Sequence, residues 1–209
     1  MLKDIRNEYQ KSVLDDAQLT DEPLAFFQRW LNEAISVGVL EPTAMVLATV
    51  RDDAPDTRIV LLKEIGSEGF IFYTNYLSQK GRQIEKNRQV ALNFFWPELE
   101  RQIRIRGTAV QIDQKKSANY FESRPRDSQL GAWASMQSKE IANRDELEKQ
   151  FDNAKKRFEN QPIPKPDHWG GYLVKPDEIE FWQGRPNRLH DRIMYQKSKE
   201  KWLIKRLQP

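Results

Sequence analysis

Cations, an imidazole and an indole are crowded into residues 181–192, near the end of the chain. If the residues after Pro186 form a strand, alternate side chains face the same side, and Arg188, His190 and Arg192 share one face. That face suits an anionic ligand such as a phosphate, because a guanidinium can bind one through two parallel hydrogen bonds. A solvated edge strand would show the same pattern, so the segment alone leaves both interpretations open.

Two further groups of residues have the chemistry to bind phosphate. Ser78 is expected to cap a helix that follows the strand 70–74, so that backbone N–H groups and Lys80 can hold an anion together. The segment 123–129 gathers two guanidinium groups and two hydroxyls at a helix end. The alternatives at these two places are an ordinary helix cap and a surface ion pair.

Two strands carry polar groups whose direction decides their role. Arg58 and Lys63 stand at the ends of an apolar run and would face opposite sides of a regular strand. They can serve one ligand only if that strand bends, and otherwise they are ordinary strand-end cations. Gln102, Arg104 and Arg106 share one face of their strand, which either lines a ligand groove or faces water.

The elements that must position these groups are mainly β. Alternating apolar runs predict strands over residues 44–50, 57–63, 70–74, 90–96, 102–112, 169–174, 179–183, 189–195 and 202–206. A helix is predicted to begin at Thr20 or Asp21 with Pro23 in its first turn, and further helices to cover residues 78–87, 114–123 and 144–158. We therefore expect a closed or nearly closed antiparallel barrel with peripheral helices over residues 20–209, preceded by a mobile arm, residues 1–19.

Composition limits the possible functions. The 209 residues carry a formal net charge of +3, from 34 Lys and Arg against 31 Asp and Glu, which does not indicate a nucleic-acid-binding protein. The absence of cysteine excludes disulfides and thiolate chemistry and favours a reducing compartment. Because the sequence has no apolar signal region and no apolar run of membrane-spanning length, we expect a cytoplasmic protein with no membrane partner.

Several common cofactor motifs are missing. Neither G-x-G-x-x-G nor G-x-x-x-x-G-K follows a strand, so any cofactor must be held by side chains. His168 and His190 lack metal-type spacing, which argues against a zinc site, and no G-x-S-x-G motif indicates acyl transfer.

Taken together, the motifs resemble those of the pyridoxine (pyridoxamine) 5′-phosphate oxidase family, the flavin enzymes that make pyridoxal 5′-phosphate. The resemblance runs in the same order along nearly the whole chain and rests on residues 58–63, 72–75, 100–102, 120–133, 137–138, 169–171 and 181–192. It implies an FMN-binding split β-barrel, and a homodimer that holds FMN non-covalently in clefts between its two subunits.

The same resemblance implies roles for single residues. FMN would be held, by residues from both subunits, through Arg58, Ile59, Val60, Leu61, Leu62, Lys63, Tyr73, Thr74, Gln79, Lys80, Gln102, Gln137, Ser138, Trp182 and Arg192. The substrate would be bound by Arg6, Tyr9, Lys63, Tyr120, Arg124, Ser128, Arg188 and His190. The catalytic residues among these would be Arg188 and His190, over the pyridine ring. One departure is Gln79, where the family commonly has an arginine, so one contact to the flavin phosphate is expected to lose its charge assistance.

The implied reaction moves a hydride from C4′ of pyridoxine 5′-phosphate or pyridoxamine 5′-phosphate to N5 of FMN. Oxygen then reoxidises the flavin and gives hydrogen peroxide, with ammonia released from the amine substrate. One alternative is a related FMN oxidoreductase with another substrate, such as a phenazine-biosynthesis oxidase. Another is a non-catalytic carrier of flavin or vitamin B6 phosphate. A nucleic-acid-binding barrel is a distant third, because the net charge is small.

Overall fold

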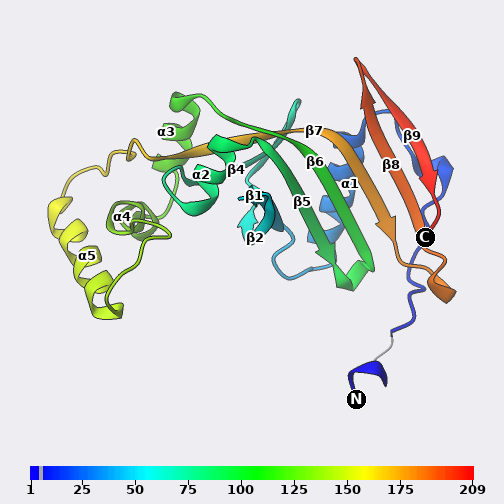
Figure 1. Cartoon of the computed structure of the whole chain (residues 1–209), viewed down its shortest axis with the longest axis horizontal. Coiled ribbons are helices and arrows are strands. Elements are labelled where there is room, and N and C mark those ends of the chain that lie inside the picture. Colours follow the sequence, from blue (N-terminus) through cyan, green and yellow to red (C-terminus); the bar gives the residue numbers. More distant parts are fainter. Residues whose placement is uncertain (5–6) are drawn as a thin grey trace.

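An open antiparallel sheet runs through the molecule (Figure 1). The computed structural model describes residues 1–4 and 7–209, and in that part nine strands are ordered β2-β1-β5-β6-β7-β4-β3, with β8 paired to β7 and β9 to β8. The strands are β1 (Ala44–Arg51), β2 (Ala54–Leu61), β3 (Glu64–Gly66), β4 (Gly69–Asn75), β5 (Gln89–Trp96), β6 (Arg101–Gln111), β7 (Trp169–Gln183), β8 (Asp191–Ser198) and β9 (Lys201–Leu207). Among the described strands, β2 and β3 end the main path without pairing with each other. The predicted barrel is therefore split rather than closed.

Strand sequence and burial follow the expected period of two. In β1, Met45 and Leu47 are buried, and in β6, Ile103 and Ile105 are fully buried while Arg104 between them is exposed. The apolar side chains of these strands consequently face one common core.

β7 joins two parts of the molecule. β6 pairs with it along one edge, while the other edge pairs first with β4 and then with β8. The first residue of β7, Trp169, packs among the helices, and its last residue, Gln183, pairs with Asp191 at the start of β8. The two ends of one strand thus lie in different surroundings (Figure 1).

α1 (Pro23–Ser36) covers the sheet with an apolar face. The ring centroid of Phe26 lies 4.4 Å from that of Phe181, and the ring centroid of Phe27 lies 4.8 Å from that of Phe70. Burying one such side chain contributes roughly 1.5–3 kcal/mol to stability, so this face fixes α1 on the core.

Four further helices gather around the start of β7 (Figure 1): α2 (Gln79–Lys86), α3 (Gln114–Glu122), α4 (Arg126–Ala134) and α5 (Arg144–Arg157). Short 3-10 turns cover Leu2–Asp4, Asp16–Gln18, Pro97–Leu99 and Pro186–Arg188. A second apolar cluster fixes α3, α4 and α5 against the first residue of β7; its buried members are Phe121, Leu130, Ala134, Ala154, Phe158, Ile163 and Trp169.

Three elements differ from the sequence-based prediction. Glu22, and not Thr20 or Asp21, is the N-cap of α1. Residues 169–174 and 179–183 form one strand instead of two, because Pro176 lies at an irregularity in the pairing with β6 and not at a strand end. The sequence analysis does not predict α4, whose N-cap, Pro125, makes no side-chain capping hydrogen bond.

The strand predicted over residues 189–195 is present as β8 but begins later than expected. Asn187 and Arg188 have φ values of 56° and 62°, in the left-handed region, and β8 begins only at Asp191. Arg188 and His190 therefore belong to an irregular loop, and the predicted common face with Arg192 does not form.

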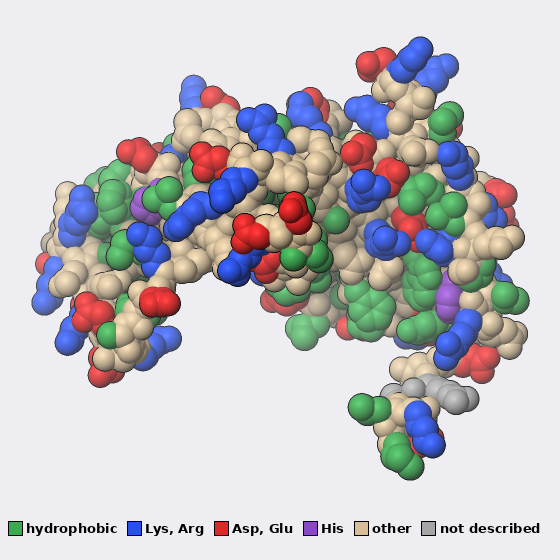
Figure 2. All heavy atoms as spheres, viewed as in Figure 1, with side chains coloured by type: hydrophobic (Ala, Val, Ile, Leu, Met, Phe, Trp, Pro, Cys, Tyr) green, Lys and Arg blue, Asp and Glu red, His purple; other side chains and the backbone are tan. Residues whose placement is uncertain are grey.

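Charged side chains of both signs are interspersed over the face shown in Figure 2. This mixture agrees with the net charge of +3 and leaves this face without the single-sign stripe that is typical of nucleic-acid binding. None of the described helices is long and apolar enough to cross a membrane.

Candidate active site

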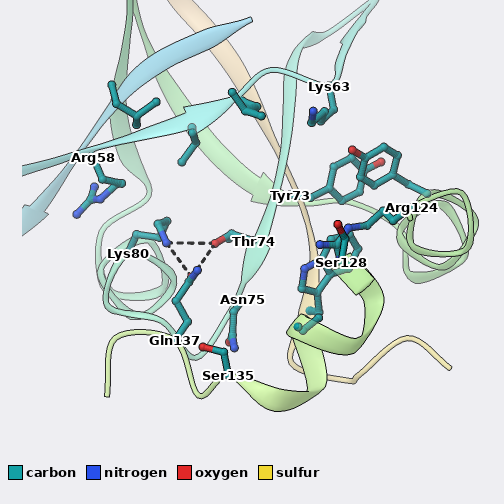
Figure 3. Close-up of a pocket in the computed structure, with 17 residues that line it drawn as sticks. Arg58, Lys63, Tyr73, Thr74, Asn75, Lys80, Arg124, Ser128, Ser135 and Gln137 are labelled. Atoms are coloured by element: carbon teal, nitrogen blue, oxygen red, sulfur yellow. Dashed lines mark hydrogen bonds between the residues drawn. The ribbon is translucent and has the colours of Figure 1, made fainter. Parts of the chain in front are cut away.

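A cavity of about 700 Å³, called here the helix-side cavity, opens beside β4 at the end of the sheet that carries α2 to α4 (Figure 3). It brings together these residues predicted to hold flavin or substrate: Arg58, Ile59, Val60, Leu61, Lys63, Tyr73, Thr74, Lys80, Tyr120, Arg124, Ser128 and Gln137. The strand 58–63 is not regular, since β2 ends at Leu61 and Leu62 turns into the core at 3% exposure. Arg58 and Lys63 can therefore line the same cavity.

Lys80 lies at the centre of one wall (Figure 3). The side chain of Ser78 caps the first turn of α2, as predicted, and this turn carries Lys80. Lys80 Nζ donates to Gln137 Oε1 at 2.9 Å and to Thr74 Oγ1 at 3.3 Å. Burial, and then the nearby Arg58, lower the pKa of Lys80. An ammonium, a hydroxyl and an amide thus converge where an anionic group can bind.

Arg58 is held in place from several sides. Its Nη1 donates to Leu47 O at 3.1 Å and to Thr49 Oγ1 at 2.6 Å, and its Nη2 donates to Gln83 Oε1 at 3.0 Å. Asp56 forms an ion pair with Nη2 at 3.1 Å. Desolvation lowers the pKa of the guanidinium, and Asp56 opposes that shift. These contacts fix the direction of Arg58 before any ligand binds.

An aromatic stack forms another wall. The rings of Tyr73 and Tyr120 lie 3.9 Å apart at 17°, and the rings of Tyr73 and Trp169 lie 5.4 Å apart at 9°. Burial raises the pKa of Tyr73 to about 12, so its hydroxyl stays a hydrogen-bond donor at neutral pH. Flat, parallel rings of this kind suit a planar ligand.

Arg124 provides a cation with a buried nitrogen that no described acceptor binds. Its guanidinium carbon lies 4.7 Å from the ring centroid of Trp169, and Nη1 is buried. Within the described residues no acceptor bonds to that nitrogen. A buried donor without a partner is costly, and an oxyanion is the acceptor that a guanidinium binds best. The Arg124 side chain, near Ser128 and on the same side of the cavity as Lys63, fits a phosphate (Figure 3).

A second cavity of about 570 Å³, called here the loop-side cavity, is lined by Asn7, Glu8, Tyr9, Arg185, Asn187, Arg188 and His190. The ring centroids of Trp182 and His190 lie 4.6 Å apart, and the ring of Tyr9 lies 5.6 Å from Trp182 and 5.8 Å from His190. The predicted residue Arg6 lies outside the described residues.

The backbone fixes the state of the His190 ring. Its Nδ1 accepts the backbone N–H of Arg185 at 3.1 Å, so a neutral ring carries its proton on Nε2. Burial, and then the charge of Arg188, lower the pKa of His190, and Asp191 partly opposes them. The neutral form of His190 thus presents an Nε2–H donor.

The remaining predicted residues lie elsewhere. Arg192 forms an ion pair with the buried Glu180 at 2.8 Å, and Gln102 lines a groove of about 640 Å³ that also contains Glu180. Gln79 and Ser138 line a separate pocket of about 370 Å³. The amide of Gln79 donates to Asp56 Oδ2 at 3.0 Å.

The two cavities lie at opposite ends of β7. Trp169 begins β7 in the helix-side cavity, and Gln183 ends it next to the loop that carries His190. A strand of 15 residues spans roughly 45 Å at about 3.3 Å per residue. One described chain therefore does not bring Arg188 and His190 to the cavity that holds Lys80 and Arg124.

Of the α4 residues that line the cavity, only Ser128 is predicted from the sequence. Gly131, Ala132 and Ser135, together with Asn75 and Trp169, complete the lining of the helix-side cavity. The available signal was the spacing of Leu130 and Ala134, which are the buried residues of α4 and lie four residues apart.

Two family models match the chain. The model described as pyridoxamine 5′-phosphate oxidase matches residues 31–158. The model described as pyridoxine 5′-phosphate oxidase C-terminal dimerisation region matches residues 169–209.

Full-length relatives and solved structures agree with these matches. A pyridoxine/pyridoxamine 5′-phosphate oxidase of Haemophilus influenzae is 52% identical over 210 residues, covering 100% of this chain and 99% of the relative. A protein of the same name from Acaryochloris marina is 48% identical over 209 residues, covering 100% and 95%. The crystal structure of PhzG from Burkholderia lata in complex with tetrahydrophenazine-1-carboxylic acid has a TM-score of 0.89 and 30% identity, covering 95% of this chain and 98% of that one. An FMN-binding protein from Nostoc punctiforme shares the fold, with a TM-score of 0.71 at 16% identity over 91% of this chain and 100% of that one.

Proposed function

The chain belongs to the pyridoxamine 5′-phosphate oxidase family, and from that premise we propose that it oxidises pyridoxine 5′-phosphate and pyridoxamine 5′-phosphate to pyridoxal 5′-phosphate. Oxygen is the final acceptor and gives hydrogen peroxide, and the amine substrate also releases ammonia. The full-length identity to curated oxidases of that name supports this reaction and a role in making the vitamin B6 cofactor.

The observation that carries the proposal is Arg124, whose buried Nη1 finds no acceptor among the described residues, in a cavity with stacked aromatic walls. A phosphate is the acceptor that would satisfy the guanidinium, and the flat walls suit a pyridine or flavin ring. In this proposal Lys63, Arg124 and Ser128 bind the substrate phosphate, and Tyr120 lies beside it.

The donor set of the same cavity fits FMN. Lys80 and Arg58 offer positive charge, Thr74 and Gln137 offer neutral hydrogen-bonding groups, and residues 59–61 also line the cavity. When bound, FMN supplies the hydride acceptor and the reaction with oxygen. We include Tyr73, Gln79, Gln102, Ser138, Trp182 and Arg192 in the proposed FMN site, with some contributed by each subunit.

The loop-side residues act on the substrate. Arg188 orients the substituent on C4′ and stabilises charge that develops there, and His190 donates a hydrogen bond from Nε2. Tyr9 closes over the ring from the N-terminal segment. Such positioning, together with exclusion of water, accounts for a large part of the lowering of a reaction barrier.

These roles require a second copy of the chain. Because β7 separates the two cavities, we propose a homodimer in which the loop-side cavity of one subunit faces the helix-side cavity of the other. The match of residues 169–209 to a region described as a dimerisation region supports this arrangement.

A related flavin oxidase with another substrate is the second candidate, favoured by the similarity to PhzG. Turnover of pyridoxine 5′-phosphate and of unphosphorylated pyridoxine separates the two. Strong preference for the phosphorylated form supports the assigned phosphate site, and equal rates contradict it.

The direct test of the reaction is an absorbance spectrum of the purified protein before and after anaerobic addition of pyridoxine 5′-phosphate. Flavin bands that bleach with substrate and return with air support the oxidase. Flavin that stays oxidised indicates a carrier or another substrate, and a protein that binds no FMN contradicts the proposed cofactor.

A further inference from the structure

Glu100, a buried carboxylate outside the two cavities, binds the N-terminal segment. Glu100 is 6% exposed and follows the 3-10 turn before β6. Its Oε2 accepts the backbone N–H of Gln10 at 2.8 Å and of Lys11 at 2.9 Å. Hydrogen bonds to a charged acceptor are among the stronger ones in proteins, and these two join parts of the chain about 90 residues apart.

The residue next to this anchor is Tyr9. Its ring lies against Trp182 and His190, and its side chain passes close to Gly184. A Cβ added to Gly184 would lie 2.7 Å from Cβ of Tyr9, so the segment fits closely onto the loop. Holding Gln10 therefore also holds Tyr9 over the loop-side cavity.

A separate set of contacts fixes the base of the segment. Leu14 is 2% exposed, and its N–H donates to Asp191 Oδ2 at 3.1 Å. Arg206 donates to Leu14 O at 3.0 Å and to Asp191 Oδ1 at 3.0 Å. Loss of the Glu100 contact would thus free residues 7–11 while the base stays attached.

We propose that Glu100 is a positioning residue, which holds residues 7–11 closed over the loop-side cavity and thereby lowers KM for the phosphorylated substrate. The part of the proposal that concerns substrate rests on the proposed function, whereas the docking of the segment rests on the Glu100 contacts. If the closed form becomes a minor population, the apparent affinity falls by that fraction. Saturating substrate restores the closed form, so KM rises and kcat is retained.

Two variants of Glu100 separate the effect of side-chain length from the effect of side-chain charge. Glu100 has a φ of 54°, a conformation that Asn tolerates well, but an Asn side chain is one methylene too short to reach the segment. Glu100→Gln is equally neutral and keeps the length, so its amide oxygen still accepts the two N–H groups. Glu98→Asn is the matched control, because Glu98 contacts Lys11 through its main-chain carbonyl.

The primary readout is trypsin cleavage after Lys11, followed by mass spectrometry of the holoenzyme without substrate. For Glu100→Asn we expect cleavage roughly tenfold faster or more, and a KM for pyridoxine 5′-phosphate raised by about fivefold or more with kcat within about twofold. Glu98→Asn should stay near the parent enzyme in all three quantities. Glu100→Gln, which keeps the reach and loses the charge, should fall between the parent enzyme and Glu100→Asn in cleavage rate and KM.

Gln10→Pro tests the same contact without touching the barrel. It removes one of the two N–H donors, so KM should rise in the same direction but less. In a Tyr9→Ala background, Glu100→Asn should raise KM no further, because Glu100 acts through Tyr9.

The proposal is overturned if Glu100→Asn leaves either the cleavage rate or KM unchanged, or if it lowers kcat instead. Should Glu100→Asn fail to fold, an unchanged KM in Gln10→Pro would overturn it equally. The cleavage assay needs no substrate. An enzyme without turnover would therefore refute the proposed function, whereas the cleavage rate would still test whether Glu100 holds residues 7–11.

Discussion

The two cavities are built in contrasting ways. The helix-side cavity is lined by strands and helices, with Arg58 held by several acceptors and Tyr73 stacked on Tyr120. The loop-side cavity is formed by an irregular loop, in which Asn187 and Arg188 have positive φ, and by an N-terminal segment fixed through long-range hydrogen bonds. The first is preformed for binding, whereas the second depends on contacts made by distant carboxylates.

We infer from this difference that the two cavities have different roles in binding and reaction. In the proposed function, rigid elements hold the groups that bind phosphate and flavin, where a fixed geometry favours affinity. The loop and the N-terminal segment would hold the groups that act at the reacting carbon and that must open for substrate to enter. Substitutions in the two cavities should therefore affect different measured quantities.

The largest expected effect is that of Arg188→Ala. Removing a cation aimed at developing charge should lower kcat/KM about 10²- to 10³-fold, while FMN affinity stays within about twofold. Steady-state kinetics and FMN titration measure the two quantities. Leu189→Ala, in the same loop at 68% exposure, is the control and should change neither. A parallel loss of FMN affinity in Arg188→Ala would contradict the proposed separation of roles between the two cavities.

Arg124→Ala should act on substrate affinity. Loss of a charge-assisted contact is expected to raise KM for pyridoxine 5′-phosphate by about 10- to 100-fold, and to change turnover of unphosphorylated pyridoxine little. Arg126→Ala serves as the control, since Arg126 donates to the main-chain carbonyls of Phe158 and Gln161. If KM rises equally for pyridoxine 5′-phosphate and for unphosphorylated pyridoxine, the phosphate does not bind at Arg124.

The pH dependence of kcat/KM tests the role of His190 in the loop-side cavity. The pKa of His190 is lowered from its ordinary value of 6.5, so the ring is neutral at pH 7. It becomes protonated only as the pH falls through this lowered pKa. Protonation removes the Nδ1 acceptor of the Arg185 N–H, and kcat/KM should then fall by about one log unit per pH unit.

NMR titration of the His190 ring gives the midpoint directly. Burial and the charge of Arg188 both lower this pKa, so Arg188→Gln should move the midpoint upward. A midpoint above 6.5 in the parent protein would show that the described environment of His190 is wrong.

The smallest expected effect is that of Gln79→Arg. The amide of Gln79 is bound to Asp56, and a guanidinium there would add positive charge near Lys80 and Arg58. We expect FMN to bind about three- to tenfold more tightly, with kcat unchanged. Fluorescence titration with FMN measures this affinity, and Gln79→Glu should shift it the opposite way. Equal affinities for all three proteins would place Gln79 outside the flavin site.

The sequence predicted the regular parts of the molecule well. The Ser78 cap, the helix with Pro23 in its first turn and the alternation in β6 depend on local chemistry and are present in the structure. The split-barrel fold was implied by the family resemblance and is confirmed. No local pattern shows that β7 continues through Pro176. The strand continues because the pairing between β6 and β7 accommodates an irregularity at this residue.

The site was harder to predict where the backbone is irregular. Residue type singled out Arg188 and His190, whose roles stay predictions, but alternation assigned them to a strand that begins only at Asp191. Positive φ at a non-glycine residue such as Arg188 has no reliable sequence signal. The anchoring role proposed for Glu100 depends on residues about 90 positions away, which no local pattern shows.

The central claim is that one active site combines the helix-side cavity of one subunit with the loop-side cavity of its partner. Mixing, unfolding and refolding two variants of low kcat/KM, Arg124→Ala and Arg188→Ala, and assaying them at a substrate concentration below the KM of the parent enzyme, tests it most directly. If the sites are shared, half of the dimers are mixed and each contains one intact site, so activity returns to about a quarter of the parent value. Activity that stays at the level of the separate variants would contradict the account.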